Sequence, residues 1–177
     1  MGMGVKKVAI IAILILLIIV ATVLISYWIN NIRCQKALND FSTMINSESI
    51  NDISLTIYYV SPLTLTLYAW SVDDLIRASE EQAIVIYGDA LVEHIDLFKQ
   101  ISKDDLVLVK KKSSYLDVRL YYVFETEEKG KIFDVAMWGC DGSIIVNGFE
   151  VKDAGIFYDV IMPFLPEDAA KKWGVFR

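Results

Sequence analysis

The sequence predicts an α+β fold: an N-terminal transmembrane helix is followed by a single domain with an antiparallel β-meander and a few packed helices. Three observations predict it. Residues 8–28 carry no charge and consist almost entirely of Ile, Leu, Val and Ala. Several later segments alternate apolar and polar residues, which is typical of half-buried strands. Runs of strands with intervening helical segments favour the α+β class.

Residues 8–28 predict a helix that contacts membrane lipid. A helix of 21 residues spans roughly 30 Å, the thickness of the hydrocarbon core of a bilayer. The segment has no polar face, which a buried helix of a soluble domain would show. Lys6 and Lys7 precede it, and Tyr27 and Trp28 end it. These four residues are the expected anchors at the membrane interfaces.

The apolar segment is expected to remain as a signal-anchor. It is longer than the apolar region of a cleaved signal peptide, and Ala21 is followed by Val23 and Leu24, which do not suit a cleavage site. The residues before Cys34 are not the small apolar ones of a lipoprotein signal. The lysines favour a short cytoplasmic tail over residues 1–7 and an extracytoplasmic body.

The body beyond the anchor is acidic. All 23 acidic residues follow Gln35, against 14 basic ones (the 17 of the chain less Lys6, Lys7 and Arg33), which gives a formal net charge of −9. An acidic body repels nucleic acid, so no nucleic-acid partner is expected. Residues 110–112 are the one local basic run, and we interpret them as a solvated strand end.

Residues 29–51 are predicted to form an amphipathic stalk and linker, and residues 52–177 the extracytoplasmic domain. In the stalk, apolar residues recur at mostly helical spacing. They are Ile32, Leu38, Phe41, Met44 and Ile45.

The first part of the domain predicts a hairpin and two helices. Residues 53–60 and 63–70 both alternate, and Ser61-Pro62 separates them, which predicts a hairpin with one solvated face. Ser71 with Asp74 three residues later resembles a capping arrangement and predicts a short helix. Residues 83–88 predict a buried strand. Asp89 is expected to cap the next helix, whose core stripe is Leu91, Ile95, Phe98 and Ile101.

The second part of the domain predicts the meander. The expected strands are residues 106–109, 115–126, 132–139, 143–146 and 149–151. Asp141-Gly142 and Asn147-Gly148 are strong hairpin signals, because both favour positive φ. In the strand over 115–126, one face is expected to carry Leu116, Val118, Leu120, Tyr122 and Phe124.

Two helices are predicted to close the chain. Asp153 can cap a helix over residues 154–162 that packs on the sheet through Phe157, Val160 and Ile161. Pro166 stands at the first turn of the last helix, which has acids early and lysines late, as the helix dipole favours.

No catalytic residue is predicted. His94 is the only histidine, and neither Glu93 nor Asp96 would face it on a helix. Among the acids of the meander, Glu125, Asp134 and Asp141 could act as an acid and base pair, but sequence does not set their separation. No phosphate-binding loop, nucleophile elbow or zinc-protease motif is present, and no cofactor is expected.

No metal site is predicted either. Cys34, Cys140 and His94 lack the spacing of zinc ligands. Two cysteines are too few for a disulfide framework, and whether they pair stays open.

The aromatic residues give the one hint of a binding surface. Alternation places Tyr58, Tyr68 and Tyr121 on the outer face of the predicted sheet. Tyrosine is enriched at protein interfaces, although it also favours ordinary cross-strand pairing. We therefore expect a non-enzymatic binding module at the cell envelope, with a protein or peptide partner.

Two alternatives remain. A hydrophobic helix that continues into an amphipathic one, followed by a meander, is similar in outline to type IV pilin-like proteins, which implies a structural subunit. Those proteins carry Glu five residues after the leader is cut; a cut after Gly2 would put Lys7 there, and a cut after Gly4 would put Ala9 there. The other alternative is an enzyme without a recognisable motif.

Overall fold

The structure is a computed structural model, and it describes residues 3–46, 52–109, 117–138, 143–152 and 155–175. The chain divides into two compact units, residues 1–33 and 34–177.

The first element is a single long helix, α1 (Met3–Ile45). Its apolar side chains from Val8 to Ile25 are exposed, as the uniform apolar composition predicts. Among the described residues, one helix is long and apolar enough to cross a membrane, and it is this one, over Lys7–Ile45. Of the expected interface anchors, Tyr27 and Trp28 are exposed.

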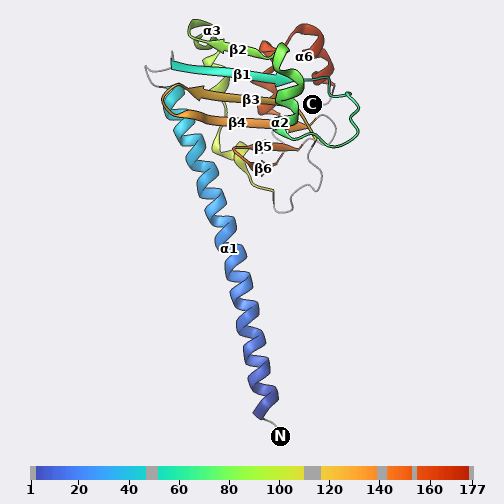
Figure 1. The fold of residues 1–177 in the computed structure, drawn as a ribbon. Coiled ribbons are helices and arrows are strands. Elements are labelled where there is room, and N and C mark those ends of the chain that lie inside the picture. Colours follow the sequence, from blue (N-terminus) through green and yellow to red (C-terminus); the bar gives the residue numbers. More distant parts are fainter. Residues whose placement is uncertain (1–2, 47–51, 110–116, 139–142, 153–154, 176–177) are drawn as a thin grey trace. The chain divides into compact units, whose positions relative to one another are not determined.

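The body is built on one six-stranded antiparallel sheet, which confirms the predicted α+β class (Figure 1). The strands lie in the order β2-β1-β3-β4-β5-β6, and each neighbouring pair is antiparallel. Their bounds are β1 (Ile53–Tyr59), β2 (Ile84–Tyr87), β3 (Val118–Thr126), β4 (Gly130–Trp138), β5 (Ile144–Val146) and β6 (Phe149–Val151).

The main core lies on one face of this sheet and includes the end of α1. Cys34, Leu38, Phe41 and Ile45 are buried there at helical spacing. The ring of Phe41 stacks on that of Phe133, with centroids 4.4 Å apart. The last turns of α1 therefore belong to the core of the body.

Short helices complete the cover of this face. The predicted core stripe of Leu91, Ile95, Phe98 and Ile101 is buried, and so are Phe157, Val160 and Ile161. The helices are α3 (Asp89–Val92), α4 (Ile95–Phe98), α5 (Ile156–Asp159) and α6 (Glu167–Gly174), with 3-10 turns at Glu80–Gln82, Lys103–Leu106 and Met162–Phe164.

The opposite face carries a smaller core under α2 (Val72–Ser79). The predicted cap of this helix is confirmed, because Ser71 and Asp74 form a full capping box. Leu75 of α2 is buried, and it packs against residues of β3 and β4. Its buried partners are Val118, Tyr121, Val123, Ala136 and Trp138.

The predicted hairpin of residues 53–60 with 63–70 is wrong. β1 pairs with β2 on one edge and with β3 on the other, so neither edge is left for residues 63–70. Those residues form a loop instead, between β1 and α2. The alternating pattern is real, but residues 63–70 are not a strand of the six-stranded sheet.

Four smaller expectations also fail. Residues 83–88 do contain a strand, β2, but it lies at the edge of the sheet with Val85 and Tyr87 exposed, so it is not the buried strand expected. Asp89 does not cap a long helix, because α3 begins at that residue and the segment breaks into α3 and α4. Residues 106–109 give only an isolated bridge between Leu108 and Val151. Val118 lies on the face opposite Leu120, because a bulge shifts the register between them.

The turn between β5 and β6 is confirmed. Asn147 and Gly148 both have positive φ, 48° and 80°, as a two-residue hairpin turn requires. The predictions at Asp141-Gly142, at residues 110–112, at Leu116 and at Asp153 fall outside the described residues.

Candidate interaction surface

The most unusual surface of the body is the loop over residues 61–70, here called the apolar loop. It exposes three leucines and a tyrosine next to one another in sequence. Leu65 is 97% exposed, Leu67 is 103% exposed, and Leu63 and Tyr68 are each 64% exposed. Exposure of large apolar side chains singly is ordinary, but a contiguous group marks an interaction site.

The loop is closed at its base by β3. The backbone N–H of Val60 donates to the carbonyl of Arg119 at 2.9 Å, and the N–H of Val118 donates to the carbonyl of Trp70 at 2.9 Å. The N–H of Trp70 also donates to the carboxylate of Asp117 at 2.7 Å. The two ends of the loop are thus held side by side by adjacent residues of one strand.

Arg119 occupies a bulge in β3. Val118 pairs with Trp138 and Leu120 with Met137, so Arg119 is the extra residue between two consecutive partners. A bulge re-aims a side chain away from the regular alternation. Here it directs an arginine that is only 3% exposed towards the apolar loop.

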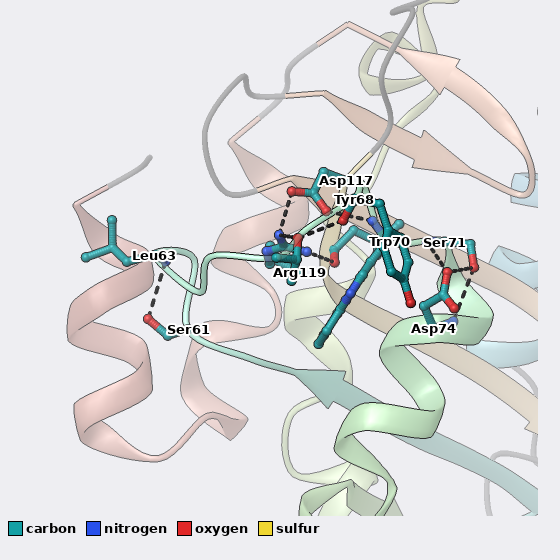
Figure 2. Close-up of polar contacts among 10 residues, drawn as sticks. Ser61, Leu63, Tyr68, Trp70, Ser71, Asp74, Asp117 and Arg119 are labelled. Atoms are coloured by element: carbon teal, nitrogen blue, oxygen red, sulfur yellow. Dashed lines mark hydrogen bonds and ion pairs between the residues drawn. The ribbon is translucent and has the colours of Figure 1, made fainter.

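The guanidinium of Arg119 is satisfied by several partners (Figure 2). It donates to Oγ1 of Thr66 at 2.8 Å, to the carboxylate of Asp117 at 2.5 Å and to the carbonyl of Val118 at 3.1 Å. Its Cζ lies 5.1 Å from the centroid of the Trp70 ring, within cation–π range. A buried charge with this many partners is stable where an unpaired one would not be.

These contacts explain which side chains the loop exposes. Thr66 faces inward to Arg119, and its own hydroxyl donates to the carbonyl of Tyr68 at 2.7 Å. The leucines on either side of Thr66 therefore face outward. The backbone N–H of Thr64 is bonded to the carbonyl of Ser61 at 2.9 Å, so the loop also has an internal turn.

The sequence-predicted tyrosines lie in three different environments. Tyr68 is exposed on the apolar loop, and Tyr58 is half-buried on β1. Tyr121 lies on the second face but is only 5% exposed, because α2 covers that face. The expectation that Tyr121 lies on an open outer face is corrected; its ring stacks with Tyr58 at a centroid distance of 6.1 Å.

Tyr121 belongs to a small polar cluster rather than to a surface. Its hydroxyl donates to Asp134 at 3.2 Å, and Nζ of Lys131 lies 3.1 Å from the same carboxylate oxygen. Burial raises the pKa of Tyr121 well above its ordinary value, and the negative charge of Asp134 raises this pKa further. Tyr121 is therefore a protonated donor that ties β3 to β4.

Of the residues considered for catalysis, His94, Glu125 and Asp134 lie on different elements of the body, and Asp141 lies outside the described residues. His94 lies between α3 and α4, and its ring packs on Phe164 at a centroid distance of 4.9 Å. The Oδ2 atom of Asp134 accepts hydrogen bonds from Tyr121 and Lys131. Within the described ranges, no three His, Cys, Asp or Glu side chains come together as metal ligands.

Cys34 is a free thiol buried in the main core. Burial raises the pKa of this thiol to about 11 from an ordinary value of 9.0. A buried thiol with a raised pKa is an inert core residue. Cys140, its only potential partner in the chain, lies outside the described residues.

No protein-family model, curated protein or solved structure matches this chain.

Sequence reasoning missed Arg119 and the three leucines of the apolar loop. The alternation of residues 63–70 predicts a strand, because alternation alone does not distinguish a strand from a loop outside the sheet. The sequence carried one signal for Arg119: it is a charged residue near the start of the otherwise apolar run Val118–Phe124. A charge at such a position needs buried partners or a bulge.

Proposed function

We propose that the chain is a single-pass membrane protein whose body is a non-enzymatic binding module, with the apolar loop as its contact surface. The observation that carries the proposal is the exposure of Leu63, Leu65 and Leu67 on a loop that a hydrogen bond from Arg119 to Thr66 holds at its middle. Fixing the loop lowers the entropy lost when a partner covers it. Each leucine covered in this way would contribute roughly 1.5–3 kcal/mol to binding.

The anchor part of this proposal rests on α1. Its apolar segment over residues 8–28 would cross the membrane, with Lys7 at one end and Tyr27 and Trp28 at the other. The lysines before the apolar segment favour the cytoplasm for that end, which puts the body outside. A reporter enzyme fused after Arg177 tests the orientation, and activity of a cytoplasm-only reporter would overturn it.

The binding role is tested by photocrosslinking of the full chain in native membranes. A photoreactive amino acid at position 65 or 67 is expected to trap a protein partner. The same probe at position 175 is the control, because Val175 is also exposed, at 79%, but lies at the end of α6. Equal labelling at all three positions, or none at 65 and 67, would contradict the proposal.

A substitution complements the crosslinking. Replacing Leu65 and Leu67 together by Asp should abolish partner capture while the melting temperature of the body stays within about 2 °C, because exposed side chains contribute little to folding. Val175→Asp is the matched control and should retain capture. Loss of capture together with a large fall in melting temperature would show that the leucines stabilise the fold instead.

A second candidate, a structural subunit of pilin-like architecture, is favoured by one observation. The apolar helix and the core helix of the body are one uninterrupted element, Met3–Ile45, and its last turns pack on the sheet through Phe41. Such a subunit would be processed near Gly2 or Gly4 and would assemble through its apolar helix. Mass measurement of the mature chain distinguishes the two, because an intact Met1 excludes processing.

A further inference from the structure

We infer that the apolar loop binds the same loop of a second copy of this chain, so that the body forms a two-fold symmetric dimer. This inference rests on the proposed function, since it names the partner of that contact surface. The loop sequence is symmetric, its exposed area suits a specific contact, and it is free of charged residues.

The sequence of the exposed segment is its own reverse. Residues 63–67 read Leu-Thr-Leu-Thr-Leu in both directions. A two-fold axis that passes by Leu65 places Leu63 of one copy opposite Leu67 of the other, and Leu65 opposite its own counterpart. In a two-fold interface, the same surface patch of each copy contacts the other copy and must be complementary to itself. The palindromic segment meets this condition because it places leucine opposite leucine.

The exposed area is near what a specific interface needs. Three leucines that are between 64% and 103% exposed, with Tyr68 at 64%, would bury on the order of 1,000 Å² in total over two copies, about the lower limit for a specific contact. Two copies tethered to one membrane also meet at a high effective concentration, so a small interface suffices.

The charge distribution leaves this surface open to a second copy. Residues 53–72 contain no Asp, Glu, Lys, Arg or His, whereas the chain carries a formal net charge of −6. Two acidic bodies repel each other over most approaches. The neutral segment that includes the apolar loop allows contact without placing like charges together.

Cysteine crosslinking of the full chain in membranes tests the inference. In a Cys140→Ser background, Leu65→Cys should give a reducible dimer on mild oxidation, and Val175→Cys should give at least tenfold less. Co-expression of Leu63→Cys and Leu67→Cys chains should give more dimer than Leu63→Cys alone, because the two-fold arrangement brings 63 and 67 together. Adding Leu67→Asp to the Leu65→Cys chain should remove the dimer.

The other outcomes separate this inference from the function on which it rests. If no self-crosslink forms at position 65 but a photoreactive group there traps a different protein, the dimer is wrong and the binding module stands. If spin-labelled lipid quenches a fluorophore attached at position 65, and a photoreactive group there traps no protein, then lipid covers the loop. Both proposals fail in that case. Equal dimer yields at 65 and 175 would reflect random collision and would also overturn the dimer.

Discussion

The guanidinium of Arg119 and the hydroxyl of Thr66, 53 residues apart in sequence, are joined by a hydrogen bond of 2.8 Å. This contact couples a bulge in β3 to the middle of the apolar loop. It turns one threonine inward, and the neighbouring leucines are consequently held outward. The exposed surface is thus set by a buried residue that a partner would never touch.

Removing Arg119 should release the loop. Arg119→Ala leaves the inward groups of Thr66 and Asp117 without their donor, and we expect a loss of about 2 kcal/mol in the free energy of unfolding. The loop should also become a site of rapid cleavage, because locally released segments are the first to be cut. Limited chymotrypsin digestion with mass analysis would detect new cuts after Leu63, Leu65, Leu67 or Tyr68.

The matched control is Arg77→Ala. Arg77 also pairs with a carboxylate, that of Asp74, but its side chain is 74% exposed, so its loss should cost well under about 1 kcal/mol and leave the cleavage pattern unchanged. Arg119→Lys should resemble Arg119→Ala, because an ammonium cannot replace a stacked, forked guanidinium. A stable, uncut Arg119→Ala chain would show that the loop holds its shape without this residue.

The sequence predicted the parts of the fold that depend on local signals. The capping box of Ser71 and Asp74, the Asn147-Gly148 turn and the stripe of Leu91 and Phe98 are all formed as expected. Each of these signals lies within a few residues, so no knowledge of distant partners was needed. The α+β class follows from their sum.

The failures depend on pairing between distant segments. Residues 63–70 alternate as well as β1 does, but β1 already pairs with β2 and β3. Which segment takes an edge is decided by sheet order, which no local pattern contains. The burial of Tyr121 fails for the same reason, because it requires that α2 cover the second face.

The end of α1 should be essential to the stability of the body. Phe41 is buried between Phe133, at a ring distance of 4.4 Å, and Phe124, at 4.7 Å. Phe41→Ala should lower the free energy of unfolding by about 3–5 kcal/mol, because it leaves a cavity in an aromatic core. Urea unfolding of the detergent-solubilised chain, followed by tryptophan fluorescence, would measure it.

Asn39→Ala is the control for this substitution, because Asn39 lies on the same part of α1 with an exposed side chain. Its effect should stay within about 0.5 kcal/mol. A similar small effect for Phe41→Ala would mean that the body folds without this helix, and that α1 serves only as an anchor.

The start of α2 should respond to acid. Hydrogen bonds from the side chain and backbone of Ser71, with the nearby Arg77, lower the pKa of Asp74 to about 2 from 3.8. Because the folded pKa is the lower one, the cap stabilises the helix fully above about pH 3.8, and this contribution is lost as the pH falls through about 2.

Carboxyl NMR shifts recorded against pH would give the pKa of Asp74 directly. Ser71→Ala should move it upward towards 3.8, because the hydroxyl that donates to Asp74 at 2.7 Å is gone. Ser102→Ala removes the equivalent hydroxyl of a second capping box, at Asp105, and should leave Asp74 unchanged. A pKa near 3.8 in the unaltered chain would show that the cap does not form.

Cys34 should resist alkylation as long as the body is folded. It is fully buried against the sheet, and at a pKa of about 11 roughly one thiol in a thousand is ionised at pH 8. In a Cys140→Ser chain, maleimide should modify Cys34 at least 100-fold more slowly than an exposed cysteine introduced by Val175→Cys. Mass spectrometry of timed samples measures both rates in one chain.

In denaturant the two rates should converge, because both thiols are then equally exposed. Rapid labelling of Cys34 without denaturant would place it outside the core, and with it the last turns of α1 on which the body is built.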